Sequence, residues 1–303
     1  MKPDPSAPPA LPLLLVTVTE VESRAVLAAF ARHTGQPARL EPRGDRAYHD
    51  LGHVNGVRVW LALSEMGAAG LGGAQQAVTK AIEALRPAAV ILVGIAFGVD
   101  DTRQSIGDIL VSENLRLYDL QRVGADDGRP QIILRGARPD SSRWLLNACK
   151  NAVLHWQGAK VRFGCVLTGD KLVDNLDFRA QLRAFEPEAI GGEMEGAGLY
   201  TACQDSRVDW LLVKAICDWA DGKKEVDRTA RQRLAAANAA EFVLHTLQTV
   251  PLRRSSGATG EAGDGRQTIQ AGSGGSAQGD KNVVAGERGL AVGGDFHGNV
   301  TIN

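Results

Sequence analysis

From Leu13 to about Val250, short runs of apolar and β-branched residues alternate with segments whose apolar residues recur at helical spacing. The first pair is Leu13 to Thr19, which suits a strand buried on both faces, and Val21 to Arg32, which has a helical pattern. Asn55-Gly56 divides Ala47 to Ser64 and favours the tight turn of a hairpin. Further helices are predicted at 74–85, 141–156, 175–185, 193–204 and 229–247, and further strands at 88–94, 107–112, 132–135, 161–168 and 210–216. This alternation predicts an α/β fold with a mixed central sheet flanked by helices in three layers.

Composition divides the chain into three zones. Residues 1–12 form a proline-rich leader, residues 13–250 a globular domain, and residues 251–303 a glycine-rich tail that holds 13 of the 35 glycines. Three β-prone units recur in the tail: Asn282 to Ala285, Gly289 to Val292 and Gly298 to Asn303. Two interpretations of the tail stay open, a linker without regular structure and a strand-repeat module that self-associates or docks on a protein partner.

Charge and cysteine usage exclude several classes of protein. The formal net charge of −1 provides no basic field, so we expect no nucleic-acid partner. No apolar run approaches the roughly 20 residues of a membrane helix, so we expect no membrane association. The four cysteines stand singly and the six histidines show no ligand spacing, which argues against a metal site, a cofactor cluster or a disulfide scaffold. We expect a cytoplasmic protein.

Two of the predicted strands end in sequence that a core does not require. Glu20 and Glu22 follow the first strand, where acidic side chains also interact favourably with the positive end of a helix. Val93 to Gly98 ends another strand in a glycine turn, whose backbone amides could face an anion, a sugar hydroxyl or a base edge, or could form a tight connection only.

Two later strand ends carry carboxylates. Gly191 to Gly198 contains Glu193, Met194 and Glu195, which we expect in the first turn of a helix, where the carboxylates could accept hydrogen bonds from a vicinal diol. The other is an apolar strand that ends at Asp218, whose carboxyl group would be partly desolvated, as suits a general acid; the alternative is a capping role.

Together these motifs resemble the purine nucleoside phosphorylase and uridine phosphorylase superfamily, and within it the 5′-methylthioadenosine/S-adenosylhomocysteine nucleosidases. The resemblance covers about Leu13 to Leu247. Its most specific parts are Glu-Met-Glu-Gly at 193–196 and Lys-Ala-Ile-Cys-Asp-Trp-Ala-Asp at 214–221. The segments 94–99, 107–112 and 166–170 also match.

The resemblance implies a site that cleaves the bond between a purine and ribose, with three catalytic residues. Asp218 would protonate the leaving base, Glu22 would orient or deprotonate the attacking water, and Glu195 would hold the ribose hydroxyls. Met194 would pack against the sugar, and backbone groups near Val173 would read the base edge. Further substrate-binding candidates are Leu172, Glu193, Gly94, Ile95, Ala96, Lys214 and Cys217.

Four positions depart from the family pattern. Lys214 stands where relatives have arginine, and Cys217 where they have the serine that orients the acid. Leu172 replaces an aromatic residue, and Ile95 a small hydroxyl residue. The resemblance therefore implies a purine nucleoside or nucleotide but leaves its 5′ substituent open.

The predicted reaction is hydrolysis of the N-glycosidic bond, because an acidic Glu22 would repel phosphate and suit water. Phosphorolysis is the alternative reaction. Two other functions are consistent with the sequence: a nucleotide-depleting effector of a bacterial conflict or antiviral system, with ATP or an NAD-like substrate, and a purine-binding module without catalysis. The resemblance also implies a homo-oligomer, since relatives build part of the site at a subunit interface.

Overall fold

The computed structural model describes residues 11–126, 129–222 and 227–252, and four short strands of the tail at 269–271, 275–277, 283–286 and 289–292. The chain divides into two compact units, Met1–Arg254 and Ser255–Asn303, and each is described by itself. Among the described residues, no helix has the length and apolar character needed to cross a bilayer. The proline-rich leader up to residue 10 lies outside the described residues.

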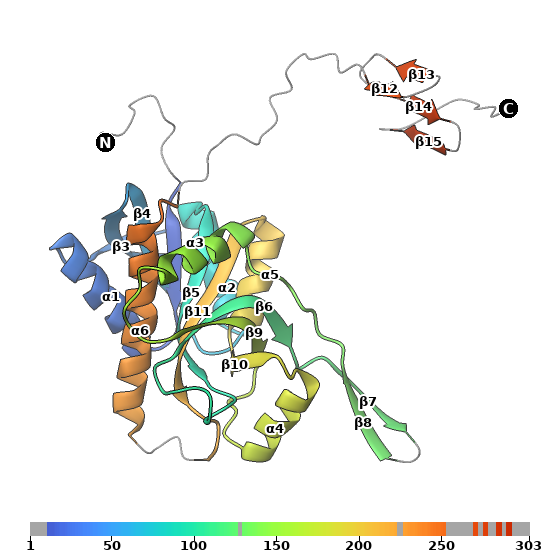
Figure 1. Cartoon of the computed structure of the whole chain (residues 1–303). Coiled ribbons are helices and arrows are strands. Elements are labelled where there is room, and N and C mark those ends of the chain that lie inside the picture. Colours follow the sequence, from blue (N-terminus) through green and yellow to red (C-terminus); the bar gives the residue numbers. More distant parts are fainter. Residues whose placement is uncertain are drawn as a thin grey trace. The chain divides into compact units, whose positions relative to one another are not determined.

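The first unit is built on a nine-stranded mixed sheet in the order β10-β9-β6-β11-β5-β1-β4-β3-β2. Its strands are β1 (Leu13–Thr17), β2 (Arg39–Arg43), β3 (Arg46–Val54), β4 (Val57–Leu63), β5 (Ala89–Phe97), β6 (Ile109–Leu117), β9 (Val161–Thr168), β10 (Ala189–Glu193) and β11 (Asp209–Asp218). A separate hairpin of β7 (Gln121–Asp126) and β8 (Arg129–Leu134) extends away from this sheet (Figure 1).

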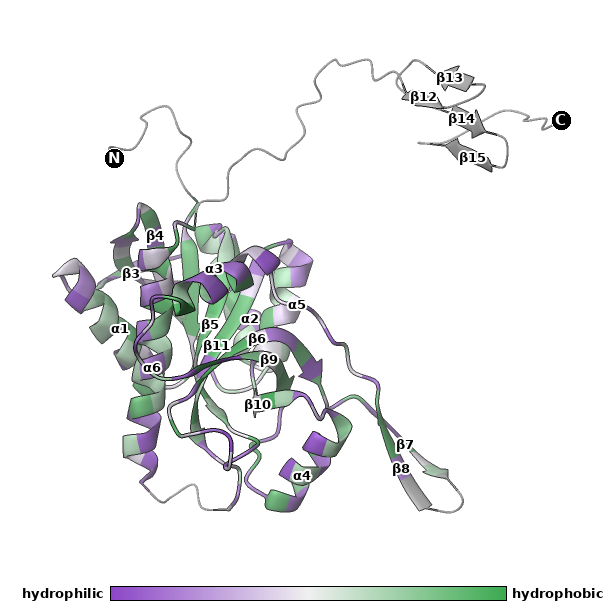
Figure 2. Ribbon diagram, viewed as in Figure 1, coloured by the Kyte–Doolittle hydropathy of each residue, from purple (hydrophilic) through white to green (hydrophobic). Residues whose placement is uncertain are grey.

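Helices cover both faces of the sheet (Figure 1). They are α1 (Glu20–Thr34), α2 (Ala74–Leu85), α3 (Arg143–Val153), α4 (Leu176–Phe185), α5 (Gly196–Ser206) and α6 (Arg228–Thr249). Neighbouring residues of β1 point to opposite faces, as the pleat of a strand requires. Leu13 and Leu15 join the core beneath α1, α3 and α6, whereas Leu14 and Val16 join the core beneath α2 and α5. The central strands are apolar along both faces (Figure 2), and the predicted three-layer α/β fold is confirmed.

Part of the sheet closes on itself. Besides its parallel pairing with β9, β10 pairs with β5 in the antiparallel sense at Gly192 and Phe97, so that β5, β11, β6, β9 and β10 form a ring. A Cβ atom on Gly192 would lie 2.2 Å from the Phe97 ring, and one on Gly191 would lie 2.3 Å from Leu110 Cδ1. The two glycines therefore permit this close approach, which brings the end of β10 next to the ends of β5 and β11.

Most predicted elements are present, and α2 and β9 have the predicted bounds. The prediction of a helix from Glu193 was wrong at its start, because α5 begins at Gly196. The Glu193 carboxylate accepts hydrogen bonds from the backbone N–H groups of Glu195 and Gly196, which makes a turn before the helix. Met194 consequently precedes α5, and Glu195 is its N-cap residue.

The second unit contains two short antiparallel hairpins, β12 (Ile269–Ala271) with β13 (Gly275–Ala277) and β14 (Val283–Gly286) with β15 (Gly289–Val292). Two of the three predicted β-prone units thus correspond to β14 and β15. The third unit, 298–303, lies outside the described residues.

Candidate active site

A cavity of about 410 Å³ opens at the end of the strand ring. The ends of β1, β5, β10 and β11 line it, together with the loop after β9 and the first turns of α6. Its lining residues are Val18, Thr19, Glu22, Met66, Ile95, Ala96, Phe97, Lys171, Leu172, Val173, Asp174, Gly192, Glu193, Met194, Glu195, Lys214, Cys217, Asp218, Arg228 and Gln232. The structure therefore brings together Glu22, Glu195 and Asp218, which lie far apart in the sequence.

Glu22 sits in a cradle of backbone amides. Its Oε2 accepts hydrogen bonds from the N–H groups of Val18 at 2.9 Å and Thr19 at 2.7 Å, and its Oε1 accepts one from Ile95 at 2.8 Å. The position follows from the sequence, because Thr19 and Glu22 form a capping box at the start of α1. Oε2 is fully engaged, whereas Oε1 keeps one lone pair for a hydroxyl or a water in the cavity.

Gly94 makes room for this carboxylate. A Cβ atom at Gly94 would lie only 2.0 Å from Glu22 Oε1, so any larger residue would displace the acid. Gly94 itself is not among the lining residues, and it shapes the cavity through Glu22.

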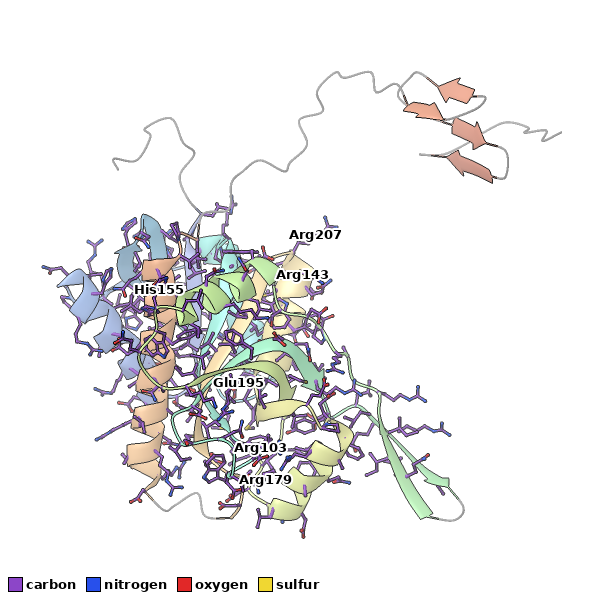
Figure 3. The ribbon with its side chains drawn as sticks, in the orientation of Figure 1. Arg103, Arg143, His155, Arg179, Glu195 and Arg207 are labelled. Atoms are coloured by element: carbon purple, nitrogen blue, oxygen red, sulfur yellow. The ribbon has the colours of Figure 1, made fainter. Side chains whose placement is uncertain are left out.

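Glu195 lies in the interior of the first unit (Met1–Arg254, called the body below), among the strands (Figure 3), and is only 4% exposed. Its Oε2 accepts a hydrogen bond of 2.7 Å from Lys214 Nζ, and its Oε1 accepts one of 3.1 Å from the backbone N–H of Gly67. Lys214 Nζ also lies 3.4 Å from Glu193 Oε2. One buried cation therefore stands between two buried carboxylates.

Burial and charge shift the pKa values of this group in defined directions. Burial alone would lower the pKa of Lys214, but the carboxylates of Glu195, Glu193 and Glu22 outweigh it and raise that pKa. Burial also raises the pKa of Glu193, against the opposing effect of Lys214. Lys214 is thus held firmly in its charged form, while ionisation of Glu193 is disfavoured.

Asp218 stands at the end of β11, half-buried, on the cavity wall. Its Oδ1 accepts a hydrogen bond of 2.9 Å from the backbone N–H of Ala220, and Cys217 Sγ lies 3.2 Å from its Oδ2. The thiol occupies the place of the orienting serine that the resemblance implies, and it is a weaker donor.

The other predicted binding residues lie on the same wall or rim. Ile95, Ala96 and Met194 line the cavity, as do Val173, which is buried, and Leu172, which is 65% exposed at the mouth. Among the residues that the structure describes, no group of three or more His, Cys, Asp or Glu side chains could hold a metal ion.

Sequence reasoning missed two contributors to the site. The glycine-rich loop between β4 and α2 supplies the Gly67 N–H to Glu195, and its Ala68 N–H donates to Asp170 Oδ1 at 2.9 Å. The first turns of α6 supply Arg228 and Gln232. The glycine-rich loop could have been found in the sequence from its four glycines among the seven residues 67–73. The start of α6 could have been found from its arginines, because acidic side chains are the ones favoured at a helix N-terminus.

Comparison with known proteins places the body in a family. The family model of the phosphorylase superfamily matches residues 14–248. The chain is 28% identical over 257 residues to an Amphimedon queenslandica protein named death domain-containing ATP nucleosidase, a match that covers 77% of this chain and 48% of that protein. This chain thus spans about half the length of that relative.

A second relative is matched over most of its length. The chain is 30% identical over 214 residues to the 5′-methylthioadenosine/S-adenosylhomocysteine nucleosidase of Maridesulfovibrio salexigens. This match covers 69% of this chain and 89% of that enzyme.

Solved structures share the fold. The corresponding nucleosidase of Neisseria meningitidis superposes with a TM-score of 0.65 at 24% identity, over 78% of this chain and 99% of that one. The futalosine hydrolase of Helicobacter pylori superposes with a TM-score of 0.65 at 20% identity, over 80% of this chain and 99% of that one. Because the family model and a relative of 30% identity both cover the body, this chain belongs to the phosphorylase superfamily, alongside its 5′-methylthioadenosine/S-adenosylhomocysteine nucleosidases.

Proposed function

We propose that this protein hydrolyses the N-glycosidic bond of an adenine nucleoside or nucleotide and releases the free base. One observation carries the proposal: Glu22, Glu195 and Asp218 line a single cavity, each held by neighbouring hydrogen-bond donors. The names of the relatives support adenine as the base, since they are nucleosidases of ATP and of 5′-methylthioadenosine or S-adenosylhomocysteine.

In this proposal each carboxylate has a separate task. Asp218 protonates the departing base while the C1′–N9 bond breaks and the ribose develops positive charge. Glu195 accepts hydrogen bonds from the ribose hydroxyls, and the hydrogen bond of 2.7 Å from Lys214 Nζ to Glu195 Oε2 holds the carboxylate in place. Glu22 Oε1 orients the water that attacks C1′ and accepts the proton that this water loses, and the net negative charge of the buried carboxylates stabilises the cationic sugar.

The Glu22 cradle favours water over phosphate as the nucleophile. Backbone amides of this kind bind anions, and here the amides of Val18, Thr19 and Ile95 already hold the Glu22 carboxylate. A phosphate in the same place would meet a negative charge instead of free donors.

Base release from a panel of nucleosides and nucleotides tests the proposal, with each substrate assayed with and without phosphate. We expect adenine release that does not depend on phosphate, loss of release in Asp218→Asn and Glu195→Gln, and unchanged release in Glu20→Gln, an exposed neighbour of Glu22. Phosphate-dependent release with ribose 1-phosphate as the product would identify a phosphorylase. Full activity of both site variants would overturn the assignment of the site.

A second candidate concerns the biological role. We propose that the enzyme can act as an effector that depletes a nucleotide pool, for example in antiviral defence, because one relative is named an ATP nucleosidase and carries a death domain. Expression of the active chain should then lower cellular ATP, whereas Asp218→Asn should not. An unchanged cellular ATP level would contradict the effector role and would favour a metabolic role for the nucleosidase.

We further propose that the protein works in the cytoplasm as a homo-oligomer and that its tail mediates self-association or binding to a protein partner. The paired hairpins β12–β13 and β14–β15 support a role in strand pairing, since short two-stranded sheets leave open edges. The number of subunits per particle, obtained from the mass in solution and the mass of one chain, should fall when the residues after Arg254 are removed. An unchanged number of subunits would overturn tail-mediated self-association.

A further inference from the structure

The proposed roles leave two parts of the cavity wall without a function. The base, the ribose and the water involve residues of β1, β5, β10, β11, the start of α1 and the loop after β9. The parts without a role are Met66, in the loop between β4 and α2, and the start of α6, where the polar side chains of Arg228 and Gln232 line the cavity. The same two residues, with Asp227, Thr229 and Ala230, also line an adjoining hollow, so the cavity continues along the first turn of α6.

The side-chain charges in the first two turns of α6 are opposite in sign to those that usually stabilise the N-terminus of a helix. Helix N-termini carry partial positive charge and favour acidic side chains. The first turn of α6 has no acidic residue, and Arg228, Arg231 and Arg233 fall within its first six positions. Its N-cap residue, Asp227, makes no capping hydrogen bond with its side chain. Positive charge is therefore concentrated where the helix would gain more stability from acids, and a bound anion would offset that cost.

The two ends of the cavity differ in charge: carboxylates lie on its buried floor, whereas its exposed mouth has Arg228 and Lys171 together with Asp174 and, in the adjoining hollow, Asp227. Glu22 and Glu195, on the floor, are 1% and 4% exposed, whereas Arg228 lies at the exposed edge. Arg228, Arg231 and Gln232 are spaced i, i+3 and i+4, so they share one helix face. Arg228 already interacts within the protein, but a guanidinium has five N–H donors and can serve a second acceptor.

We propose that the substrate is a nucleotide whose 5′-phosphate groups bind Arg228 and Gln232 at the start of α6. This inference rests on the proposed function, because it assumes that the ribose lies against Glu195 and the base against Asp218. A nucleotide has the complementary order of charge: its ribose becomes cationic at the buried carboxylates, and its anionic phosphates lie beside Arg228 at the mouth. A 5′-thioether would gain nothing from these polar donors.

The test is the specificity of the full-length chain. Adenine release is measured with ATP, AMP, adenosine and 5′-methylthioadenosine, and kcat and KM are determined separately for each. We expect a higher kcat/KM for ATP and AMP than for the two uncharged nucleosides. In Arg228→Met, the ratio of kcat/KM for ATP to that for adenosine should fall by about tenfold to a hundredfold, mainly through KM, since a hydrogen bond to a charged group is lost.

Two further variants sharpen this test. Arg228→Lys should recover part of the ratio, because it restores the charge but not the planar set of donors. Arg233→Met is the matched control: it removes an arginine of the same helix that lines a different hollow, with Glu20 and Arg24, and the ratio should not change.

The outcomes separate this inference from the function on which it rests. If the wild type releases adenine from none of the four substrates, the proposed function fails. If it cleaves adenosine or 5′-methylthioadenosine at least as efficiently as the nucleotides, and Arg228→Met leaves the ratio unchanged, the enzyme is a nucleosidase and the phosphate-binding role of α6 is wrong.

Discussion

Lys214 is the buried cation that contacts both Glu195 and Glu193 in the site. It is 1% exposed and serves Glu195 and Glu193 at once. Removing one partner of a buried ion pair leaves an uncompensated charge, which typically costs about 3 to 5 kcal/mol of stability. Lys214→Met should therefore lower the free energy of unfolding by this amount and abolish adenine release, whereas Lys214→Arg should retain most of both. Denaturant unfolding and the kcat of adenine release check this prediction.

A surface lysine provides the control. Lys150 pairs with Glu113 at 2.7 Å, but its side chain is 49% exposed, and exposed pairs contribute only about 0 to 1 kcal/mol. Lys150→Met should leave stability and activity close to those of the wild type. Equal behaviour of Lys214→Met and Lys150→Met would contradict the role given to Lys214.

Glu193 should make stability depend on pH. Burial raises its pKa, so the folded chain keeps a proton that the unfolded chain releases from about pH 4.5 upward. The bound proton stabilises the folded chain fully below about pH 4.5, and this stabilisation is lost as the pH rises from there to the pKa of Glu193 in the folded chain. In this pH range the free energy of unfolding of the wild type falls by up to about 1.4 kcal/mol per pH unit, whereas that of Glu193→Gln does not fall for this reason. Unfolding at pH 5, 6, 7 and 8 should show a relative gain for Glu193→Gln as the pH rises. A constant difference between the two proteins would refute it.

At the scale of elements, the junction of β5 with α1 controls the nucleophile. Gly94 on β5 leaves the space that Glu22 of α1 fills, 2.0 Å from where a Cβ atom would lie. Gly94→Ala should displace the carboxylate and lower kcat by about a hundredfold or more, because small shifts of a catalytic group have large effects on rate. KM should change little, since Glu195 and Lys214 still hold the ribose side of the site.

The control for this junction is Gly124→Ala on β7. A Cβ atom there would meet only Arg122 Nε, at 3.8 Å, which is an ordinary contact. We expect wild-type kcat from this variant. A Gly94→Ala enzyme that hydrolyses substrate at the wild-type rate would show that the position of Glu22 is not critical.

The sequence predicted the elements whose apolar pattern reflects burial. The continuous apolar run of β1, the buried second half of β9 and the amphipathic α2 were recognised because their side chains enter the core. The edge strand β2 was missed, since its Arg-Leu-Glu-Pro-Arg sequence is mostly exposed and has no apolar alternation. The start of α5 was wrong because the Glu193 side chain binds the backbone amides of the first turn, which no periodicity reports.

Sequence motifs identified the catalytic residues of the candidate site, but they did not predict how these residues are arranged in space. Glu22, Glu195 and Asp218 were identified from the family resemblance, but the closure of the sheet at Gly192 and Phe97 depends on a pairing between strands distant in sequence. Arg228 and Gln232 carry no motif, and they join the site only because α6 begins at the cavity.

At the scale of the whole molecule, the catalytic unit should not need the tail for its stability. Among the described residues, the last core side chain is Leu252, which is 7% exposed and packs with α6 and the sheet. A chain that ends at Arg254 should therefore keep the melting temperature and the kcat/KM of the full chain.

A chain that ends at Val250 makes the matched comparison, because it lacks only four further residues, Leu252 among them. Loss of a buried leucine removes about 1.5 to 3 kcal/mol of hydrophobic stabilisation. The free energies of unfolding of the two truncated chains, measured by thermal unfolding, should differ by that amount. The longer of the two chains should match the full chain. If ending the chain at Arg254 lowers the melting temperature as much as ending it at Val250, the tail contributes to the fold of the body, and the division of the molecule into a catalytic unit and a separate tail is wrong.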